Sequence, residues 1–269
     1  MNVVWAFLVV AGVAAVAIAA LLLVRSRAPE GGYFEDGDRA AGVFGVLATG
    51  FSVLLGFIVF LAFTSYDQSR TGAEQEALIL VQQVENAQFL PPSARAELTG
   101  ELVCYGRTVV NEWGEVRDDT INPWGVELFH TLRTVQPQSD TQQSAYDKWL
   151  DQTSTREEAR LDRIHGAVGV IPTTLWIVLF LIAAVILAFM LFFADRAERA
   201  VVQAMLIGSV VVVMAALMLL LRGLDEPFHG GVGGLQPVAM ERSLRLIDEA
   251  LSAIGDPVQI PCDALGRPS

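Results

Sequence analysis

The chain has 269 residues, of which 53% are apolar, with a mean hydropathy of +0.46 and a net charge of −12. This apolar excess is unusual for a soluble globular protein, and the acidic balance argues against a nucleic-acid partner, which would need a basic face. The three histidines lie far apart and no catalytic or metal-binding motif is present, so the sequence predicts no catalytic residue, no cofactor and no metal site.

Four segments carry the apolar excess, and none of them contains Asp, Glu, Lys, Arg or His. They are 3–24, 41–65, 173–194 and 200–221. Each is about as long as the roughly 20 residues that cross a bilayer as a helix. The basic residues Arg25 and Arg27 follow the first segment instead of preceding it, which favours a retained span over a cleaved signal peptide. The sequence therefore predicts an all-α, multi-pass protein of the plasma membrane.

The first two spans, 1–65, form one predicted unit, and the second span has the clearest internal pattern. Small residues recur on one face at steps of three and four: Gly42, Gly45, Thr49, Ser52 and Gly56. Such a face allows close helix packing in lipid. Alternatively it lines a pore, with Phe57, Ile58 or nearby apolar side chains as the constriction. Gly45, Thr49, Ser52 and Gly56 are the candidate lining residues.

Segment 66–172 is predicted to be a helical bundle outside the membrane. It holds 9 Lys or Arg and 17 Asp or Glu, and it has almost no strand pattern. A first helix continues from the second span and ends at Pro91-Pro92, because proline cannot continue a helix interior. Asn122-Pro123 has the form of a second helix start. Trp113 and Trp124 lie on apolar stripes and are expected in the core.

The residues next to the second span form a candidate juxtamembrane motif. The members of this motif that follow the second span are Tyr66, Asp67, Arg70 and Glu76. A long helix over 141–165 returns to the membrane and carries Arg156, Arg160 and Arg163 on one face. These arginines can meet the acids of the outgoing helix. The arrangement is either an ion-pair network that braces the two helices or a charged vestibule at a pore mouth.

The second pair of spans, 173–222, is followed by a turn, a short helix and a tail over 223–269. The turn adds Asp225, Pro227, Phe228 and Gly230 to the juxtamembrane motif. Asp225 is expected to cap backbone amides, and a gating or ion-binding role is the alternative. Cys104 and Cys262 fall on the same side of four spans, where they either form a disulfide or pack as free thiols.

The arginines beside the spans favour one orientation. The two short loops carry five of them: Arg25, Arg27, Arg39, Arg196 and Arg199. About four lie close to the spans on the other side: Arg70, Arg160, Arg163 and the border residue Arg222. Because basic residues near span ends favour the cytoplasm, we expect the helical domain and both termini outside it.

Several segments in this order resemble the bestrophin-like family of bacterial membrane proteins. They are LLGFIVFLAFTSYDQSR with GAEQEA, YGRTVVNEW, REEARLDRI before IPTTLW, and LDEPFHG. The resemblance implies a distant likeness to bestrophins, which are pentameric anion channels with an apolar neck on the second span and a cytosolic helical domain. It further implies that the LDEPFHG turn and Glu76 are structurally important. The acidic cluster of the bestrophin calcium clasp is absent.

Two functions from different classes follow. The first is a homo-oligomeric ion channel, with anions as the candidate ion and the second span lining the pore. The second is a membrane-anchored binding or signalling module without transport, whose acidic bundle recruits a partner. The absence of ionisable groups from the spans argues against a proton-relay transporter but is compatible with a channel. The predicted partners are the lipid bilayer and further copies of the chain; the conducted ion is left unknown.

Overall fold

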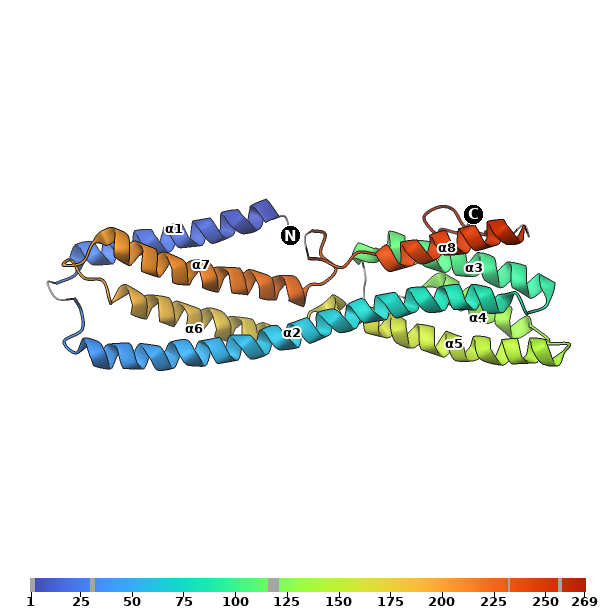
Figure 1. Cartoon of the computed structure of the whole chain (residues 1–269), viewed down its shortest axis with the longest axis horizontal. Coiled ribbons are helices and arrows are strands. Elements are labelled where there is room, and N and C mark those ends of the chain that lie inside the picture. The colour runs from blue at the N-terminus through green and yellow to red at the C-terminus, as the bar shows by residue number, and fades with distance from the viewer. Residues whose placement is uncertain (1–2, 30–31, 116–120, 232, 256–257) are drawn as a thin grey trace. The chain divides into compact units, whose positions relative to one another are not determined.

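The computed structural model describes residues 3–29, 32–115, 121–231, 233–255 and 258–269. These ranges are helical, with one isolated bridge between Cys262 and Pro268 and no strand. The helices are α1 (Val3–Arg27), α2 (Gly37–Ala87), α3 (Pro92–Asn111), α4 (Pro123–Thr134), α5 (Asp140–His165), α6 (Thr173–Leu191), α7 (Ala200–Asp225) and α8 (Val238–Ile254), with short 3₁₀ turns η1 (Trp113–Glu115) and η2 (Gly166–Val168) (Figure 1).

Four of these helices are long and apolar enough to cross a bilayer, namely α1, α2, α6 and α7. Three of them contain the predicted spans 3–24, 41–65 and 200–221, and α6 ends three residues before the end of the predicted span 173–194; the all-α, four-span fold class is confirmed. The chain divides into two compact units, and α2 contributes to both. The first unit comprises Met1–Thr64, Gly169–Glu226 and Gly230–Gly234.

Apolar side chains hold the first unit together. One core cluster joins α2, α6 and α7 through residues such as Phe51, Leu55 and Leu179. A second cluster joins α1 to α7, with Leu21 and Val211 almost completely buried. Most other side chains of these helices are exposed, as expected for surfaces that face lipid or other copies of the chain.

The second unit comprises Ser65–Val168, Pro227–His229 and Leu235–Ser269. It is a bundle of the C-terminal part of α2 with α3, α4, α5 and α8. In the segment predicted to hold a turn, a short helix and a tail, 223–269, α8 and the tail pack into this bundle through residues such as Met240 and Ile247. Cys104 of α3 and Cys262 of the tail form a disulfide.

Local sequence signals explain how the bundle helices begin. The Asn122 side chain accepts a hydrogen bond from the backbone N–H of Trp124 at 3.0 Å, and Pro123 occupies the first helical position of α4. Ser139 caps α5 in the same way. Trp113 and Trp124 are buried, as expected, and their indole N–H groups donate to backbone carbonyls of Leu235 and Gly266.

Candidate functional site

The candidate pore face of α2 is exposed within one copy of the chain. Thr49, Ser52 and Phe57 are exposed, and a Cβ added at Gly45 or Gly56 meets nothing within 4 Å. No neighbouring helix of the same copy therefore covers this face. Close packing within one copy does not explain the small residues. They remain available to lipid, to another copy of the chain or to a pore.

Ile58 does not share that face. It is only 4% exposed and lies in the core formed by α2, α6 and α7, whereas Phe57 is 67% exposed. The hundred-degree step between neighbouring helical residues separates the two side chains. Phe57 can therefore contribute to a surface or constriction outside the single copy, while Ile58 stabilises the copy itself.

Part of the small-residue face borders a groove. Ser52 and Gly56 of α2 and Ser209 of α7 are among the residues that line an open groove of about 520 Å³. The serine hydroxyls donate to carbonyls of their own helices, Ser52 to Ala48 and Ser209 to Leu206. This satisfies their hydrogen-bonding needs in an apolar environment.

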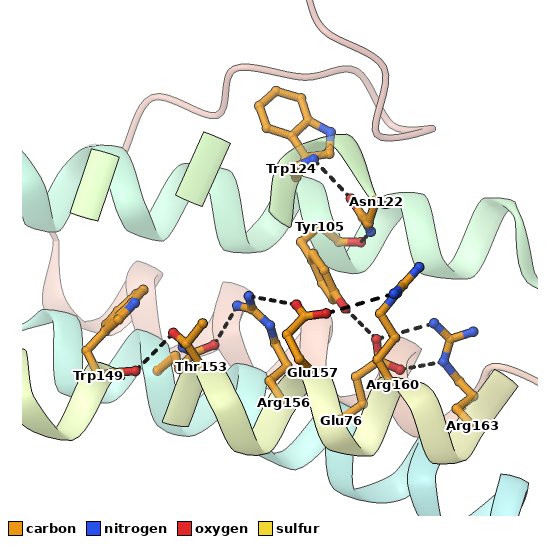
Figure 2. Close-up of polar contacts among 11 residues, drawn as sticks. Glu76, Tyr105, Asn122, Trp124, Trp149, Thr153, Arg156, Glu157, Arg160 and Arg163 are labelled. Atoms are coloured by element: carbon orange, nitrogen blue, oxygen red, sulfur yellow. Dashed lines mark hydrogen bonds and ion pairs between the residues drawn. The ribbon is translucent and has the colours of Figure 1, made fainter. Parts of the chain in front are cut away.

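Glu76 is the centre of a polar cluster inside the second unit (Figure 2). Its carboxylate is completely buried and accepts hydrogen bonds from Nε and Nη2 of Arg163, the second at 3.3 Å. The hydroxyl of Tyr105 donates to the same carboxylate at 2.6 Å. Three helices, α2, α3 and α5, thus meet at one carboxylate.

Electrostatics in this cluster favour the charged pair. Burial of the Arg163 guanidinium would lower its pKa, but the Glu76 carboxylate outweighs burial, and the pKa of Arg163 is raised. Burial first, and the negative charge of Glu76 second, raise the pKa of Tyr105 well above its usual value. Tyr105 therefore stays a neutral donor and Arg163 a cation at physiological pH. The Arg163 guanidinium also lies 5.4 Å from the ring centre of Trp113.

The cluster extends along α2 and α5 as a polar seam. We define the seam as Ser69, Glu76 and Gln83 of α2 together with their respective partners Gly166, Arg163 and Arg156. The three α2 residues are seven positions apart, so they share one helix face. Ser69 accepts from the N–H of Gly166 at 3.1 Å, and Gln83 accepts from Nη1 of Arg156 at 2.7 Å. The seam fixes the register of the two helices.

The other predicted members of the juxtamembrane motif are placed differently. Arg70 pairs with Glu74 on the exposed face of α2 at 3.2 Å, and Asp67 is also exposed. Arg160 pairs with Glu157 of its own helix at 3.8 Å. Tyr66 is partly buried against the core of the second unit. Of the arginines expected to meet the outgoing helix, Arg163 reaches Glu76, while Arg156 reaches the amide of Gln83.

Asp225 is engaged by backbone and side-chain donors within the first unit. One carboxylate oxygen accepts from the N–H groups of Val170 and Ile171, at 2.8 and 2.9 Å, and the other accepts from the Trp176 indole at 3.2 Å. Asp225 is 5% exposed. It therefore ties the end of α7 to the start of α6, and its carboxylate has little remaining capacity for an ion.

The rest of the turn belongs mainly to the second unit. The carbonyl of Pro227 accepts from the N–H of Leu235 at 2.7 Å, and Phe228 packs edge-on against Trp113. Gly230 is exposed. In the described ranges, no group of three or more His, Cys, Asp or Glu side chains is arranged to hold a metal ion.

The sequence pattern of the bestrophin-like domain matches residues 11–237. The chain belongs to the bestrophin-like family. The match begins within the first span and covers the other three spans, the polar seam and the turn around Asp225. The predicted family resemblance is therefore confirmed. No curated protein matches the chain.

Several solved structures share the fold of this chain. A mutant of a bacterial bestrophin homologue from Klebsiella pneumoniae is similar with a TM-score of 0.68 at 12% identity, covering 94% of this chain and 99% of that chain. A second mutant of that homologue gives 0.67 at 13% identity, with 92% and 99% covered. A crystal structure described as a membrane protein gives 0.69 at 11% identity, with 92% and 99% covered. At such identities the likeness concerns the fold.

Two features of the site were not predicted from sequence: the part played by Gln83 and Ser69, and the Tyr105 contact to Glu76. The sequence does hold a signal for the part played by Ser69 and Gln83. These residues and Glu76 recur at seven-residue steps on α2, and Arg156 and Arg163 are seven residues apart on α5. Tyr105 lies among apolar residues of α3, and nothing in the local pattern indicates that its hydroxyl meets a carboxylate on another helix.

Proposed function

We propose that this chain assembles into a homo-oligomeric ion channel in which α2 lines the pore. Membership of the bestrophin-like family supports an ion-channel kind of function. The observation that carries the proposal is the exposed face of α2, where Thr49, Ser52 and the nearby Phe57 are exposed and a Cβ at Gly45 or Gly56 meets nothing within 4 Å. Apolar rings can gate ion flow by excluding water, so such a face needs no charged filter.

The conducted ion is tested separately from the channel itself. The likeness to bestrophins favours anions. The exposed charges of α2 beyond the span are mostly acidic, with Asp67, Glu74 and Glu85 against Arg70 alone, and such a surface enriches cations. The reversal potential in asymmetric salt distinguishes the two, since its sign reports which ion carries the current.

The test of the channel is current through purified protein in a planar bilayer, combined with Gly56→Trp. A Cβ at Gly56 meets nothing within one copy, so added bulk should leave each copy folded. If the face lines a pore, the variant forms oligomers of wild-type mass but carries no current. Gly12→Trp is the matched control, because Gly12 of α1 also has open space around it and should keep its current.

The alternative outcomes separate the two candidate functions. A Gly56→Trp protein that dissociates on size exclusion places the face at a contact between copies, because close approach needs small residues. Wild-type protein that carries no current in any salt favours the membrane-anchored binding module. The observation that supports this second function is the acidic bundle, with 17 acidic and 9 basic residues in 66–172.

We also propose that the second unit lies outside the cytoplasm of cells that make the protein. Two observations support this orientation: the arginines of the short loops, and the disulfide between Cys104 and Cys262, which persists only in an oxidising compartment. Both cysteines are buried, so we would replace them with serine and introduce single cysteines at exposed positions. A membrane-impermeant thiol reagent on intact cells should label Ser154→Cys and not Ala197→Cys. The reverse pattern contradicts the orientation.

A further inference from the structure

A second groove lies in the first unit, on a face formed by α1, α6 and α7. It has a volume of about 770 Å³ and is lined mostly by apolar side chains. Three alanines, Ala183, Ala184 and Ala215, keep it open. From Thr173 to Leu187, its α6 wall rises about 21 Å at 1.5 Å per residue. The hydrocarbon of one leaflet is about 15 Å thick, so one acyl chain can lie along the groove.

One end of this groove is polar. Thr173 at the start of α6, Trp176 and Arg222 all line it there. Arg222 directly follows the charge-free stretch of α7, and Trp176 is fixed by its hydrogen bond to Asp225. A cation and an aromatic ring at the end of an apolar stretch mark the level of lipid headgroups.

Arg222 has an acidic neighbour one helical turn later. Its guanidinium pairs with Glu226, and the two side chains remain 54% and 48% exposed. A guanidinium has five N–H donors, so the pair leaves Arg222 with donors for a phosphate oxygen. The exposed Glu226 carboxylate would repel a purely anionic headgroup and accept hydrogen bonds from an ammonium.

We infer that this groove binds a phospholipid whose headgroup carries both a phosphate and a primary ammonium, as in phosphatidylethanolamine. An acyl chain lies between α1, α6 and α7, the phosphate meets Arg222 and the ammonium meets Glu226. Choline lipids lack ammonium N–H donors for Glu226, and glycerol lipids lack the positive charge. The inference is independent of ion conduction, because it concerns bound lipid alone.

Native mass spectrometry of the full chain in detergent tests the site. Phosphatidylethanolamine, phosphatidylcholine and phosphatidylglycerol with identical acyl chains would be titrated separately. We expect the Kd for phosphatidylethanolamine to be lower by about fivefold, which corresponds to about 1 kcal/mol for exposed charge pairs. Arg222→Gln removes the contact to the phosphate that all three lipids share, so it should raise the Kd of each, whereas Glu226→Gln should reduce the preference to about twofold or less. Arg39→Gln, an exposed arginine outside the groove, is the matched control and should retain it.

A second variant tests the groove itself. Ala184 is exposed, so Ala184→Trp fills the groove without entering the core, and it should remove the tightly bound lipid. Equal affinity of the wild-type protein for the three lipids would overturn the inference, since bulk lipid then fills the groove. An undiminished preference in Glu226→Gln, or an unchanged Kd in Arg222→Gln, would overturn it as well. A change in oligomeric mass of Ala184→Trp would assign the groove to a contact between copies.

Discussion

Glu76 and Arg163 are 87 residues apart in the sequence, yet they form a buried ion pair between α2 and α5. α2 continues from the second span, and α5 precedes the third span by only a short turn. The pair therefore joins the two helices that connect the bundle to the spans. Its carboxylate is completely buried and its guanidinium almost so.

We predict that Glu76→Gln destabilises the protein by about 3–5 kcal/mol, because it leaves the buried Arg163 charge without its partner. The loss should be visible as a lower melting temperature of the purified protein in detergent. Arg163→Met should cost a similar amount, since it leaves the buried Glu76 carboxylate without its cation.

The exposed pair Arg70 and Glu74 is the matched control on the same helix. Glu74→Gln should change stability by no more than about 0.5 kcal/mol, as is usual for exposed pairs. Equal effects of Glu76→Gln and Glu74→Gln would show that the buried pair does not stabilise the fold.

Much of the fold could be predicted from sequence because the membrane imposes a strong pattern. Uncharged runs of about 20 residues have few interpretations, and Asn122-Pro123 marks the start of α4 through its own local chemistry. Arg163 and Glu76 could be singled out because charged residues on facing helices pair. Choosing Arg163 over Arg160 depends on the packing of α2 and α5, which no local pattern gives.

The position of the C-terminal segment could not be predicted in this way. α8 is amphipathic and short, so its apolar face indicates that it packs against something without indicating what. Its docking depends on close approaches such as Gly106 of α3, where an added Cβ would lie 2.9 Å from Leu244. The choice between a disulfide and two free thiols likewise needed the distance between Cys104 and Cys262.

Gly72 of α2 lies directly against the backbone of α5. A Cβ at this position would lie 2.7 Å from the carbonyl oxygen of Ala159 and would also clash with the backbone N–H of Arg163. Neither is the movable end of a side chain. We therefore predict that Gly72→Ala destabilises the protein by about 1–3 kcal/mol, the usual cost of overpacking. Gly50→Ala of the same helix has nothing within 4 Å and should melt at or slightly above the wild-type temperature.

Glu101 should make the stability of the bundle depend on pH. Burial, and then the nearby carboxylates Glu97 and Glu127, raise the pKa of Glu101 from 4.5 to about 7, although Thr131 donates a hydrogen bond to it at 2.7 Å. The folded protein holds this proton more tightly than the unfolded chain. The stabilisation is therefore complete below pH 4.5 and is lost as the pH rises to about 7 and beyond.

The corresponding experiment compares wild type and Glu101→Gln at several pH values, so that all other titrations cancel. We expect equal stability near pH 4.5 and an advantage of about 1–3 kcal/mol for the variant at pH 8, since the glutamine is never ionised. A difference that is constant from pH 4.5 to pH 8 would contradict the prediction, because it would show that Glu101 does not titrate in this range.

The disulfide between Cys104 and Cys262 joins residues separated by 158 positions, and it holds the C-terminal tail on α3. The tail makes further contacts there, because the Trp124 indole donates to the carbonyl of Gly266 at 2.6 Å. Gly266 has a φ of +79° and lies directly against Thr108 of α3. Cross-links over long loops stabilise mainly by restricting the unfolded chain, typically by 2–4 kcal/mol. We predict that a reductant lowers the melting temperature of the wild-type protein to that of the Cys104→Ser/Cys262→Ser variant, and that the variant does not respond to reductant.

Gly266→Ala should lower the melting temperature in both redox states, since its added Cβ clashes with the Thr108 backbone independently of the disulfide. A wild-type melting temperature that is the same with and without reductant, in protein shown by thiol titration to have been oxidised and then reduced, would mean that the tail contacts alone hold the C-terminus in place.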